Sequence, residues 1–184
     1  MNYSGELLNV DLHQLSKGIT IQNSNHTYYL LGLIDGYSRV AWVEVLDSKK
    51  ALDVMFGFLK SFNFLRMEYG IESESLMTDN GSEFGGGAGT QDKEHHPFER
   101  LLLELGIKHK YTQPYNPQQN GKVERFWKTL KEDFIEGSLY EDVSDLKEEL
   151  LGFLVYYNEH RPHSSLGGLT PKEFLEKNNK NVTN

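Results

Sequence analysis

Apolar and polar residues alternate strictly near the beginning of the chain. Within residues 6–15 (ELLNVDLHQL), Leu8, Val10 and Leu12 share one side and polar residues occupy the other. A period of two is typical of a β-strand with one buried face. The next run, residues 26–34 (HTYYLLGLI), is almost continuously apolar and rich in aromatic residues. It predicts a strand that is buried on both faces.

A turn and a third strand follow this apolar run. Residues 35–38 (DGYS) have the composition of a turn, and residues 39–46 (RVAWVEVL) are rich in β-branched and aromatic side chains. Residues 26–46 are therefore expected to form an antiparallel hairpin.

Helical and strand patterns alternate over the rest of the chain. After the hairpin, apolar residues recur at helical spacing, at Leu52, Met55, Phe56, Leu59 and Phe62. The remaining expected elements are a short strand and turn within 75–84, a helix over 97–106, a strand over 107–112, and helices from Lys122, over 142–160 and over 170–177. Thr170 is the expected N-cap of the last helix, with Pro171 behind it.

The order of these elements predicts the fold class. Three consecutive strands precede an alternation of helices and strands, which indicates an α/β fold with a mixed five-stranded sheet flanked by helices. The chain has 184 residues, enough for one domain with a core and too few for two. We expect residues 1–175 to form this domain and residues 176–184 to be a disordered tail.

Composition narrows the class of protein. With 38% hydrophobic and 12% aromatic residues, the chain is typical of a globular protein, and the absence of cysteine excludes disulfides and thiolate metal sites. The apolar runs are too short to span a bilayer, and no secretory leader follows Met1. We expect an intracellular protein without a membrane partner.

Charge is distributed unevenly along the chain. The net charge of -8 argues mildly against a nucleic-acid partner, because phosphate contacts require lysine and arginine. Within residues 108–131, however, Glu124 is the one acid, and it stands among Lys108, Lys110, Lys122, Arg125, Lys128 and Lys131. This segment predicts a local basic surface on an acidic protein.

Three carboxylates stand where such a fold can bind ligands. Asp11 is on the polar side of the first strand, Asp79 ends the fourth strand, and Glu124 lies in the first turn of a helix. The carboxyl ends of strands commonly face ligands, and Mg²⁺ prefers carboxylates together with waters and phosphates. Taken singly, each acid is more readily explained as a turn former or a helix cap.

Longer motifs connect the three acids. They are LIDGYSRVAWVEVL, TDNGSEF, GIKHKYTQPYNPQQNGKVERFWKTLK and YYNEHRPHSSLGGLTPKEFL. In this order, and with Asp11 in an early strand, they resemble the catalytic cores of retroviral integrases and DDE transposases, a family with a ribonuclease-H-like fold. The closing motif is more similar to bacterial insertion-sequence transposases than to viral integrases.

The resemblance implies both an activity and a metal site. Asp11, Asp79 and Glu124 match the family's catalytic acids, which hold two Mg²⁺ ions, with Mn²⁺ as a substitute. The implied reaction is hydrolysis at the ends of a DNA element, followed by attack of the freed 3′-hydroxyl on target DNA. DNA is then the partner, a homo-oligomer joins two ends, and the expected location is the bacterial cytoplasm, at the nucleoid. The helix-turn-helix region that usually precedes such cores is expected to be absent from this chain.

Five residues are candidates for DNA contacts. Lys128 and Lys131 share a helix face with Glu124 and match DNA-contacting lysines of integrases, whereas Lys122 lies further round the helix. Tyr115 offers a ring for stacking on an unpaired base, and Asn120 can donate hydrogen bonds. A solvated lysine face and ordinary turn formation are the alternatives.

The chain departs from the family in one place. Asp79 and Glu124 are 45 positions apart, longer than usual, and the excess falls in residues 85–96 (GGGAGTQDKEHH). These residues have no apolar period and indicate a surface insertion of undetermined role. Its His95-His96 pair is better explained as exposed side chains than as a metal site.

Other acids and other functions remain as alternatives. Glu83, Glu132 and Asp133 lie near the motifs without matching them, and Asp35 is the first substitute for Asp11, although its Asp-Gly turn explains it structurally. The rival functions are a ribonuclease-H-like nuclease that cuts without joining, and a non-catalytic core that only binds DNA or multimerises.

Overall fold

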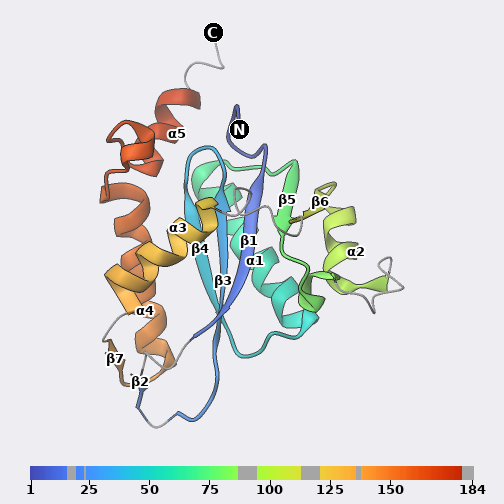
Figure 1. Cartoon of the computed structure of the whole chain (residues 1–184), viewed down its shortest axis with the longest axis vertical. Helices are drawn as coiled ribbons and strands as arrows, with labels where there is room; N and C mark the ends of the chain where they lie inside the picture. The colour runs from blue at the N-terminus through green and yellow to red at the C-terminus, as the bar shows by residue number, and fades with distance from the viewer. Residues whose placement is uncertain (16–19, 23, 87–94, 113–120, 136–137, 180–184) are drawn as a thin grey trace.

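A mixed five-stranded sheet forms the centre of the computed structural model (Figure 1). The structure describes residues 1–15, 20–22, 24–86, 95–112, 121–135 and 138–179. The sheet order is β4-β3-β1-β5-β6, with β1 at Leu8–Gln14, β3 at Tyr29–Asp35, β4 at Ala41–Leu46, β5 at Ser75–Thr78 and β6 at Lys108–Tyr111. The fold class predicted from the order of elements is confirmed.

Strand β1 lies in the middle of the sheet and pairs differently on its two sides. It is antiparallel to β3, with Asp11 opposite Gly32, and parallel to β5, with Asn9 opposite Met77. The β3–β4 pair is antiparallel, as expected for the hairpin, and the β5–β6 pair is parallel. Since β1 and β5 run in the same direction, their carboxyl ends approach the same region of the sheet.

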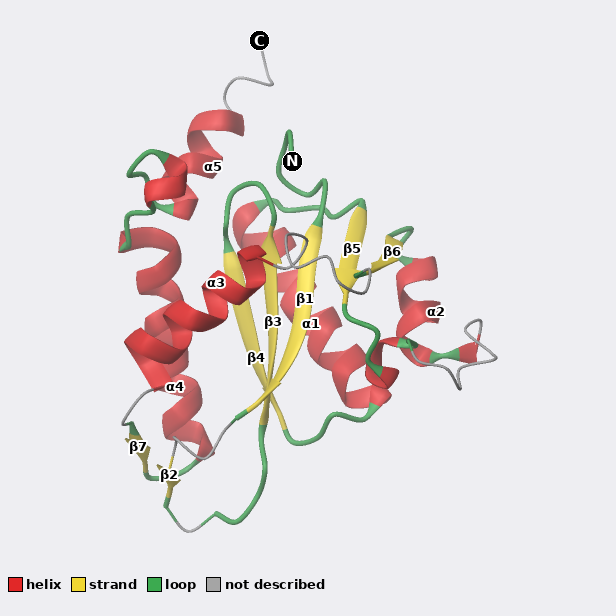
Figure 2. Ribbon diagram, viewed as in Figure 1, coloured by secondary structure: helices red, strands yellow, loops and turns green. Residues whose placement is uncertain are grey.

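Helices cover both faces of the sheet (Figure 2). The α-helices are α1 at Ala51–Tyr69, α2 at Pro97–Glu104, α3 at Gly121–Leu130, α4 at Val143–Val155 and α5 at Pro171–Asn179. Short 3₁₀-helices are η1 at Ser82–Phe84 and η6 at Ser164–Leu166, and short π-helices are η4 at Lys131–Ile135 and η5 at Tyr156–His160. In the part of the chain described, no helix is both long enough and apolar enough to cross a membrane.

Two hydrophobic cores lie on the two sides of the sheet. Leu31 and Leu33 of β3 pack in the core that contains α1 and α2, whereas Leu30 and Ile34 pack in the core that contains α3 and α4. All four side chains are buried. The prediction that this apolar strand is covered on both faces is therefore confirmed.

Two short strands were not apparent in the pattern. Thr20–Ile21 (β2) and Leu139–Tyr140 (β7) form a separate parallel pair, with Ile21 opposite Tyr140. A strand of two residues cannot display a hydrophobic period, and the contact joins segments far apart in sequence. Such pairing depends on tertiary structure rather than on local preference.

Helix α5 begins at the predicted cap. The backbone N–H of Glu173 donates to Thr170 Oγ1 at 3.2 Å, and the backbone N–H of Thr170 donates to Glu173 Oε2 at 2.9 Å. This reciprocal capping box satisfies two backbone donors at the start of the helix. The helix continues to Asn179 and so includes residues 176–179, for which the sequence predicts a disordered tail.

Candidate active site

Asp11 lies in β1, on the face of the sheet that α3 covers. Its Oδ2 accepts a hydrogen bond from Trp127 Nε1 at 2.9 Å, and His13 Nε2 lies 3.1 Å from the same oxygen. The His13 ring also stacks on Trp127, with ring centroids 4.3 Å apart. Trp127 therefore orients the Asp11 carboxylate, whose side chain is still 24% exposed.

Gly32 allows Trp127 to approach the sheet this closely. It lies directly opposite Asp11, and a Cβ atom at this position would be only 2.6 Å from the Trp127 ring. A glycine inside an apolar strand is a sequence signal for such close approach. The signal was present in the chain, but it does not identify the side chain that fills the space.

Replacing Gly32 by alanine is expected to push Trp127 away from Asp11. Overpacking of this kind typically costs about 1–3 kcal/mol, which urea unfolding would measure. The emission of Trp127 should also change, because its indole loses its hydrogen-bond acceptor.

The matched control is Gly152→Ala in α4, where an added Cβ meets nothing within 4 Å. Alanine is preferred over glycine inside a helix by about 1 kcal/mol, so this variant should be as stable as the original or more stable. Equal stability of Gly32→Ala and Gly152→Ala would contradict the proposed crowding.

Asp79 follows β5 directly. Its Oδ1 accepts a hydrogen bond from the backbone N–H of Gly81 at 2.9 Å, which fixes the side chain in an Asx turn. The pairing of β1 with β5 sets Asn9 opposite Met77. Asp79 therefore follows the strand that is paired in parallel with β1, the strand that carries Asp11.

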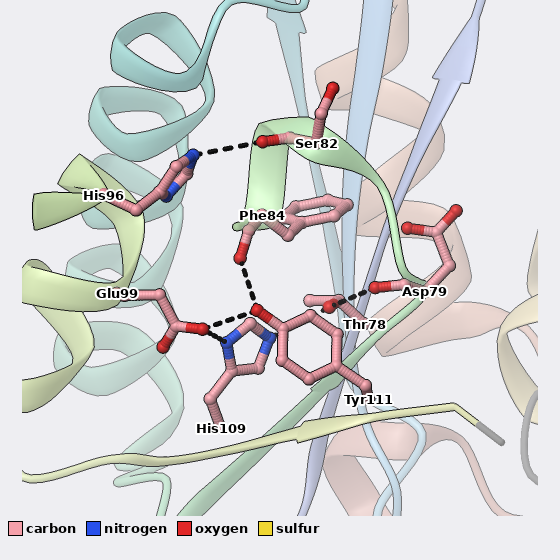
Figure 3. Close-up of polar contacts among 8 residues, drawn as sticks. All are labelled: Thr78, Asp79, Ser82, Phe84, His96, Glu99, His109 and Tyr111. Carbon is pink, nitrogen blue, oxygen red and sulfur yellow. Dashed lines mark hydrogen bonds and ion pairs between the residues drawn. The ribbon is translucent and has the colours of Figure 1, made fainter. Parts of the chain in front are cut away.

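A polar network holds the backbone of Asp79 (Figure 3). Thr78 Oγ1 donates to the Asp79 carbonyl oxygen at 2.8 Å and lies 2.9 Å from His109 Nε2. His109 Nδ1 lies 3.1 Å from Glu99 Oε1, and the His109 side chain is only 6% exposed. Glu99 on α2, His109 on β6 and Thr78 on β5 thus form one chain of polar contacts that ends at Asp79.

Tyr111 extends this network to η1. Its hydroxyl contacts the Glu99 carboxylate and lies 3.0 Å from the Phe84 carbonyl oxygen (Figure 3). Burial, followed by the hydrogen bond to Glu99, raises the pKa of Tyr111, so the hydroxyl remains protonated at neutral pH. Nothing in the periodicity of the chain predicted this network, because its members come from four separate elements.

Glu124 is exposed in the first turn of α3, three residues before Trp127. The apolar residues Val123, Phe126, Trp127 and Leu130 of this helix are all buried, as their helical spacing leads one to expect. Helix α3 crosses the sheet in front of β3 and β4, with its first turn toward β1 (Figure 1). Glu124 is thereby held on a rigid helix whose Trp127 contacts Asp11.

The three candidate acids thus lie on β1, directly after β5, and on α3, and both β5 and α3 contact β1. They do not form a preassembled metal cluster: among the residues described, no three acidic, histidine or cysteine side chains are grouped closely enough to hold a metal ion. His96, from the histidine pair of the insertion, instead has Nε2 3.0 Å from the Ser82 carbonyl oxygen.

Asp35 has a structural role. Its Oδ2 accepts from the backbone N–H and the hydroxyl of Ser38, each at 2.7 Å, and its Oδ1 accepts from the Gly5 N–H at 2.9 Å. Ser4 Oγ adds a longer contact of 3.3 Å, and Asp35 is completely buried. These contacts agree with the turn-forming role expected for this residue.

Of the five candidate residues for DNA contacts, the structure describes the three lysines. Tyr115 and Asn120 lie outside the described residues. Lys128 is exposed, with Nζ 3.6 Å from Glu132 Oε1, and it lines a shallow groove with Lys131, His13 and Trp127. The exposed lysines therefore border the face of α3 that carries Glu124.

Lys122 is placed differently from these two lysines. Its Nζ donates to the Gly36 carbonyl oxygen at 2.7 Å, on the other flank of α3. Burial, followed by the charge of Arg39, lowers the pKa of Lys122.

Comparison with known proteins agrees with this architecture. Two family models, both described as integrase core domain, match residues 7–117 and residues 105–171. Together they span the strands, α3 and the closing motif. The chain therefore belongs to the integrase core domain family.

Relatives in sequence come from mobile elements. A putative integrase, ORF3 of Spiroplasma virus SpV1-C74, is 30% identical over 151 residues, which are 80% of this chain and 42% of the viral protein. An uncharacterized protein of insertion element IS136 from Agrobacterium fabrum is also 30% identical over 151 residues, 78% of this chain and 71% of its own length. The putative transposase InsD of element IS2E from Escherichia coli is 34% identical over 131 residues, 70% of this chain and 54% of InsD. The chain thus spans only part of each relative.

Similar solved structures support the fold. The catalytic core of HTLV-2 integrase, determined in complex with magnesium, aligns with a TM-score of 0.65 and 16% identity, over 94% of this chain and 97% of that core. The catalytic core of BIV integrase aligns with a TM-score of 0.62 and 24% identity, over 97% of this chain and 99% of that core. The predicted ribonuclease-H-like fold is therefore confirmed.

Proposed function

We propose that this chain is the catalytic core of a DNA transposase that cleaves element ends and joins the 3′-hydroxyl to target DNA. The proposal is supported by the match of Asp11, Asp79 and Glu124 to the family's motifs, and by their positions on β1, directly after β5 and on α3 of an integrase core domain. Asp11 and Asp79 are held by hydrogen bonds from Trp127 and Gly81, and Glu124 projects from the helix that Trp127 anchors.

The chemistry of the donor set fits Mg²⁺. All three side chains are carboxylates, and hard divalent cations prefer oxygen ligands. Asp79 Oδ2 and both oxygens of Glu124 accept no hydrogen bond within the described part of the chain, so they remain available as ligands. Asp11, Asp79 and Glu124 would hold two Mg²⁺ ions, and Mn²⁺ would substitute. When bound, the ions activate the attacking oxygen and stabilise the leaving oxygen of an in-line displacement at phosphorus.

The protein's own contribution is positioning. The Trp127 indole fixes one oxygen of Asp11, and the Gly81 N–H fixes one oxygen of Asp79. The chain of contacts from Glu99 through His109 and Thr78 holds the Asp79 backbone. Pre-oriented carboxylates reorganise less during the reaction, and no covalent intermediate with the protein is needed, so a serine or lysine nucleophile has no role.

The partners follow from this chemistry. Two element ends must be joined to one target, so we infer that DNA and a second copy of the protein complete the working complex. Bacterial and viral mobile elements encode the relatives, which favours the bacterial cytoplasm and the nucleoid as the site of action.

A branched DNA that already contains a strand-transfer junction offers the most direct test. Reversal of joining on this substrate does not require recognition of the element's ends, which are unknown. We expect the purified protein to resolve the junction with Mg²⁺ or Mn²⁺ and to lose at least about 100-fold in rate with EDTA.

The products distinguish the rival functions. Nicks without resolved or joined strands would indicate a nuclease, and DNA binding without any cleavage would indicate a non-catalytic core. Resolution that persists at full rate in EDTA would contradict the metal-dependent mechanism.

A further inference from the structure

A cavity of about 460 Å³ lies between α3 and the segment that follows η5. Its described lining includes four cationic residues and no acidic residue: Arg39, Lys122, Arg125 and Arg161. His163 and Ser164 also line it. The chain as a whole has 27 acidic and 19 basic residues, so this concentration of positive charge runs against the average of the protein.

Two of the cations converge without a carboxylate between them. Arg39 Nη1 and Lys122 Nζ both donate to the carbonyl oxygen of Gly36, the lysine at 2.7 Å. Burial lowers the pKa of Arg39 and of Lys122, and the charge of Arg39 lowers the pKa of Lys122 further. Arg39 also has a φ of 65°, which is uncommon for a residue other than glycine. The turn between β3 and β4 therefore holds a guanidinium in a crowded cationic environment.

The nearby acids do not neutralise the cavity fully. Asp35, the acid next to this turn, is buried, and Ser38 and Gly5 donate to its two oxygens. Asp133 accepts from Arg161 Nε at 3.3 Å, which leaves the terminal nitrogens of that guanidinium for another partner. The lining therefore has unused donors and excess positive charge.

A polar ring atom also lacks a partner in this cavity. His163 Nε2 is buried and makes no hydrogen bond within the described residues. Burial, followed by the charge of Arg161, lowers the pKa of His163. A bound anion would offset the positive charge around this ring and favour its protonated form, whose Nε2–H would then donate to an anion oxygen.

The shape and the donors favour a phosphate group within a chain. Arginine guanidinium groups recognise phosphate through paired N–H donors, and Ser164 can add a hydroxyl. The cavity is larger than a single phosphate and can admit an adjacent sugar. It also lies on the opposite flank of α3 from the groove formed by Lys128 and Lys131.

We propose that this cavity is a binding site for a backbone phosphate of DNA, so that bound DNA contacts both flanks of α3. That the ligand is DNA rests on the proposed function, whereas the preference for phosphate rests on the cavity alone. Arg125 contributes the charge that is easiest to remove, because it is exposed and makes no ion pair with another described residue, whereas Arg161 also pairs with Asp133.

The test is DNA binding in EDTA, which is independent of cleavage. Fluorescence anisotropy with a labelled duplex over a salt series would compare the wild type with Arg125→Gln and Arg161→Gln. Each variant should lower the salt slope by about 0.9 and weaken binding about fivefold at about 0.15 M salt. The matched control is Arg100→Gln on α2, an exposed arginine on the other side of the sheet, which should leave affinity and slope unchanged.

A second measurement keeps the proposal independent of DNA. Inorganic phosphate should shift the imidazole NMR signals of His163 in the wild type, and Arg125→Gln should weaken this response while thermal unfolding shows that the variant is folded. Unchanged salt slopes in both variants would overturn the proposal, even if the wild type cleaves DNA. Unchanged slopes together with loss of a dimer would instead assign the cavity to an acidic segment of a second copy. Reduced slopes in a protein that never cleaves would support the cavity and contradict the proposed catalysis.

Discussion

Replacing Glu124 by glutamine is expected to lower Mg²⁺-dependent cleavage and joining by more than about 100-fold. Mutation of a residue that merely supports a metal ligand typically costs about 10–100-fold, so loss of a direct ligand should cost more. Glutamine preserves the size and hydrogen-bonding capacity of the side chain and removes only its charge. The experiment therefore isolates the electrostatic contribution of this carboxylate.

Stability should change little in this variant. Glu124 is exposed and makes no hydrogen bond or ion pair with another described residue. Lys128, four residues along the helix, pairs with Glu132 instead, so loss of the Glu124 charge should cost less than about 0.5 kcal/mol. Thermal unfolding of Glu124→Gln should therefore resemble that of the wild type.

Glu132→Gln is the matched control for Glu124→Gln. Glu132 is also exposed, lies on the continuation of the same helix, and pairs with Lys128 at 3.6 Å. Its replacement should leave cleavage intact, because Glu132 does not match the family's catalytic acids. If Glu124→Gln and Glu132→Gln cleave equally well, Glu124 is not a metal ligand and the proposed site is wrong.

Replacing Asp35 by alanine is expected to destabilise the fold by about 2–5 kcal/mol. The change leaves the buried N–H groups of Gly5 and Ser38 without their acceptor. Each unsatisfied buried donor costs about 1–3 kcal/mol, and a small cavity adds to the loss. Urea unfolding would measure the difference in the free energy of unfolding.

Asp47→Ala provides the comparison for this prediction. Asp47 follows β4, its side chain is 80% exposed, and its ion pair with His26 is long at 3.9 Å. Its replacement should change stability by less than about 0.5 kcal/mol. A small effect of Asp35→Ala as well would mean that the hydrogen bonds to Ser38 and Gly5 contribute little, and Asp35 would again need a functional explanation.

Much of the fold follows from local patterns that the chain displays directly. Alternation along β1, the continuous apolar run of β3 and the helical stripe of α3 each predict which faces are buried, because side-chain direction in a regular element follows from its period. The capping box at Thr170 and Glu173 is equally local. These elements are where prediction and structure agree.

For the candidate site, the sequence and the structure supply different information. The motifs around Asp11, Asp79 and Glu124 single out these acids without any coordinates, since the spacing of motifs along the chain carries the resemblance to the family. Which groups orient them could not be predicted. Trp127 reaches Asp11 across 116 positions, and His109 reaches Thr78 across 31.

The amino-acid sequence by itself therefore determined the order of the main elements and the buried faces of β1, β3 and α3, because these depend on local periodicity, and its motifs nominated the three acids. The apolar spacing in α1 did not identify the buried face of that helix, since Leu52 and Phe56 are exposed whereas Val54 and Phe58 are buried. Only the tertiary structure decided that Gly32 makes room for Trp127 over Asp11, that Glu99 and His109 support Asp79, and that Arg39 joins Arg161 in one cavity. Each of these contacts joins side chains from separate elements, and their meeting depends on how helices and strands pack rather than on any local preference of the chain.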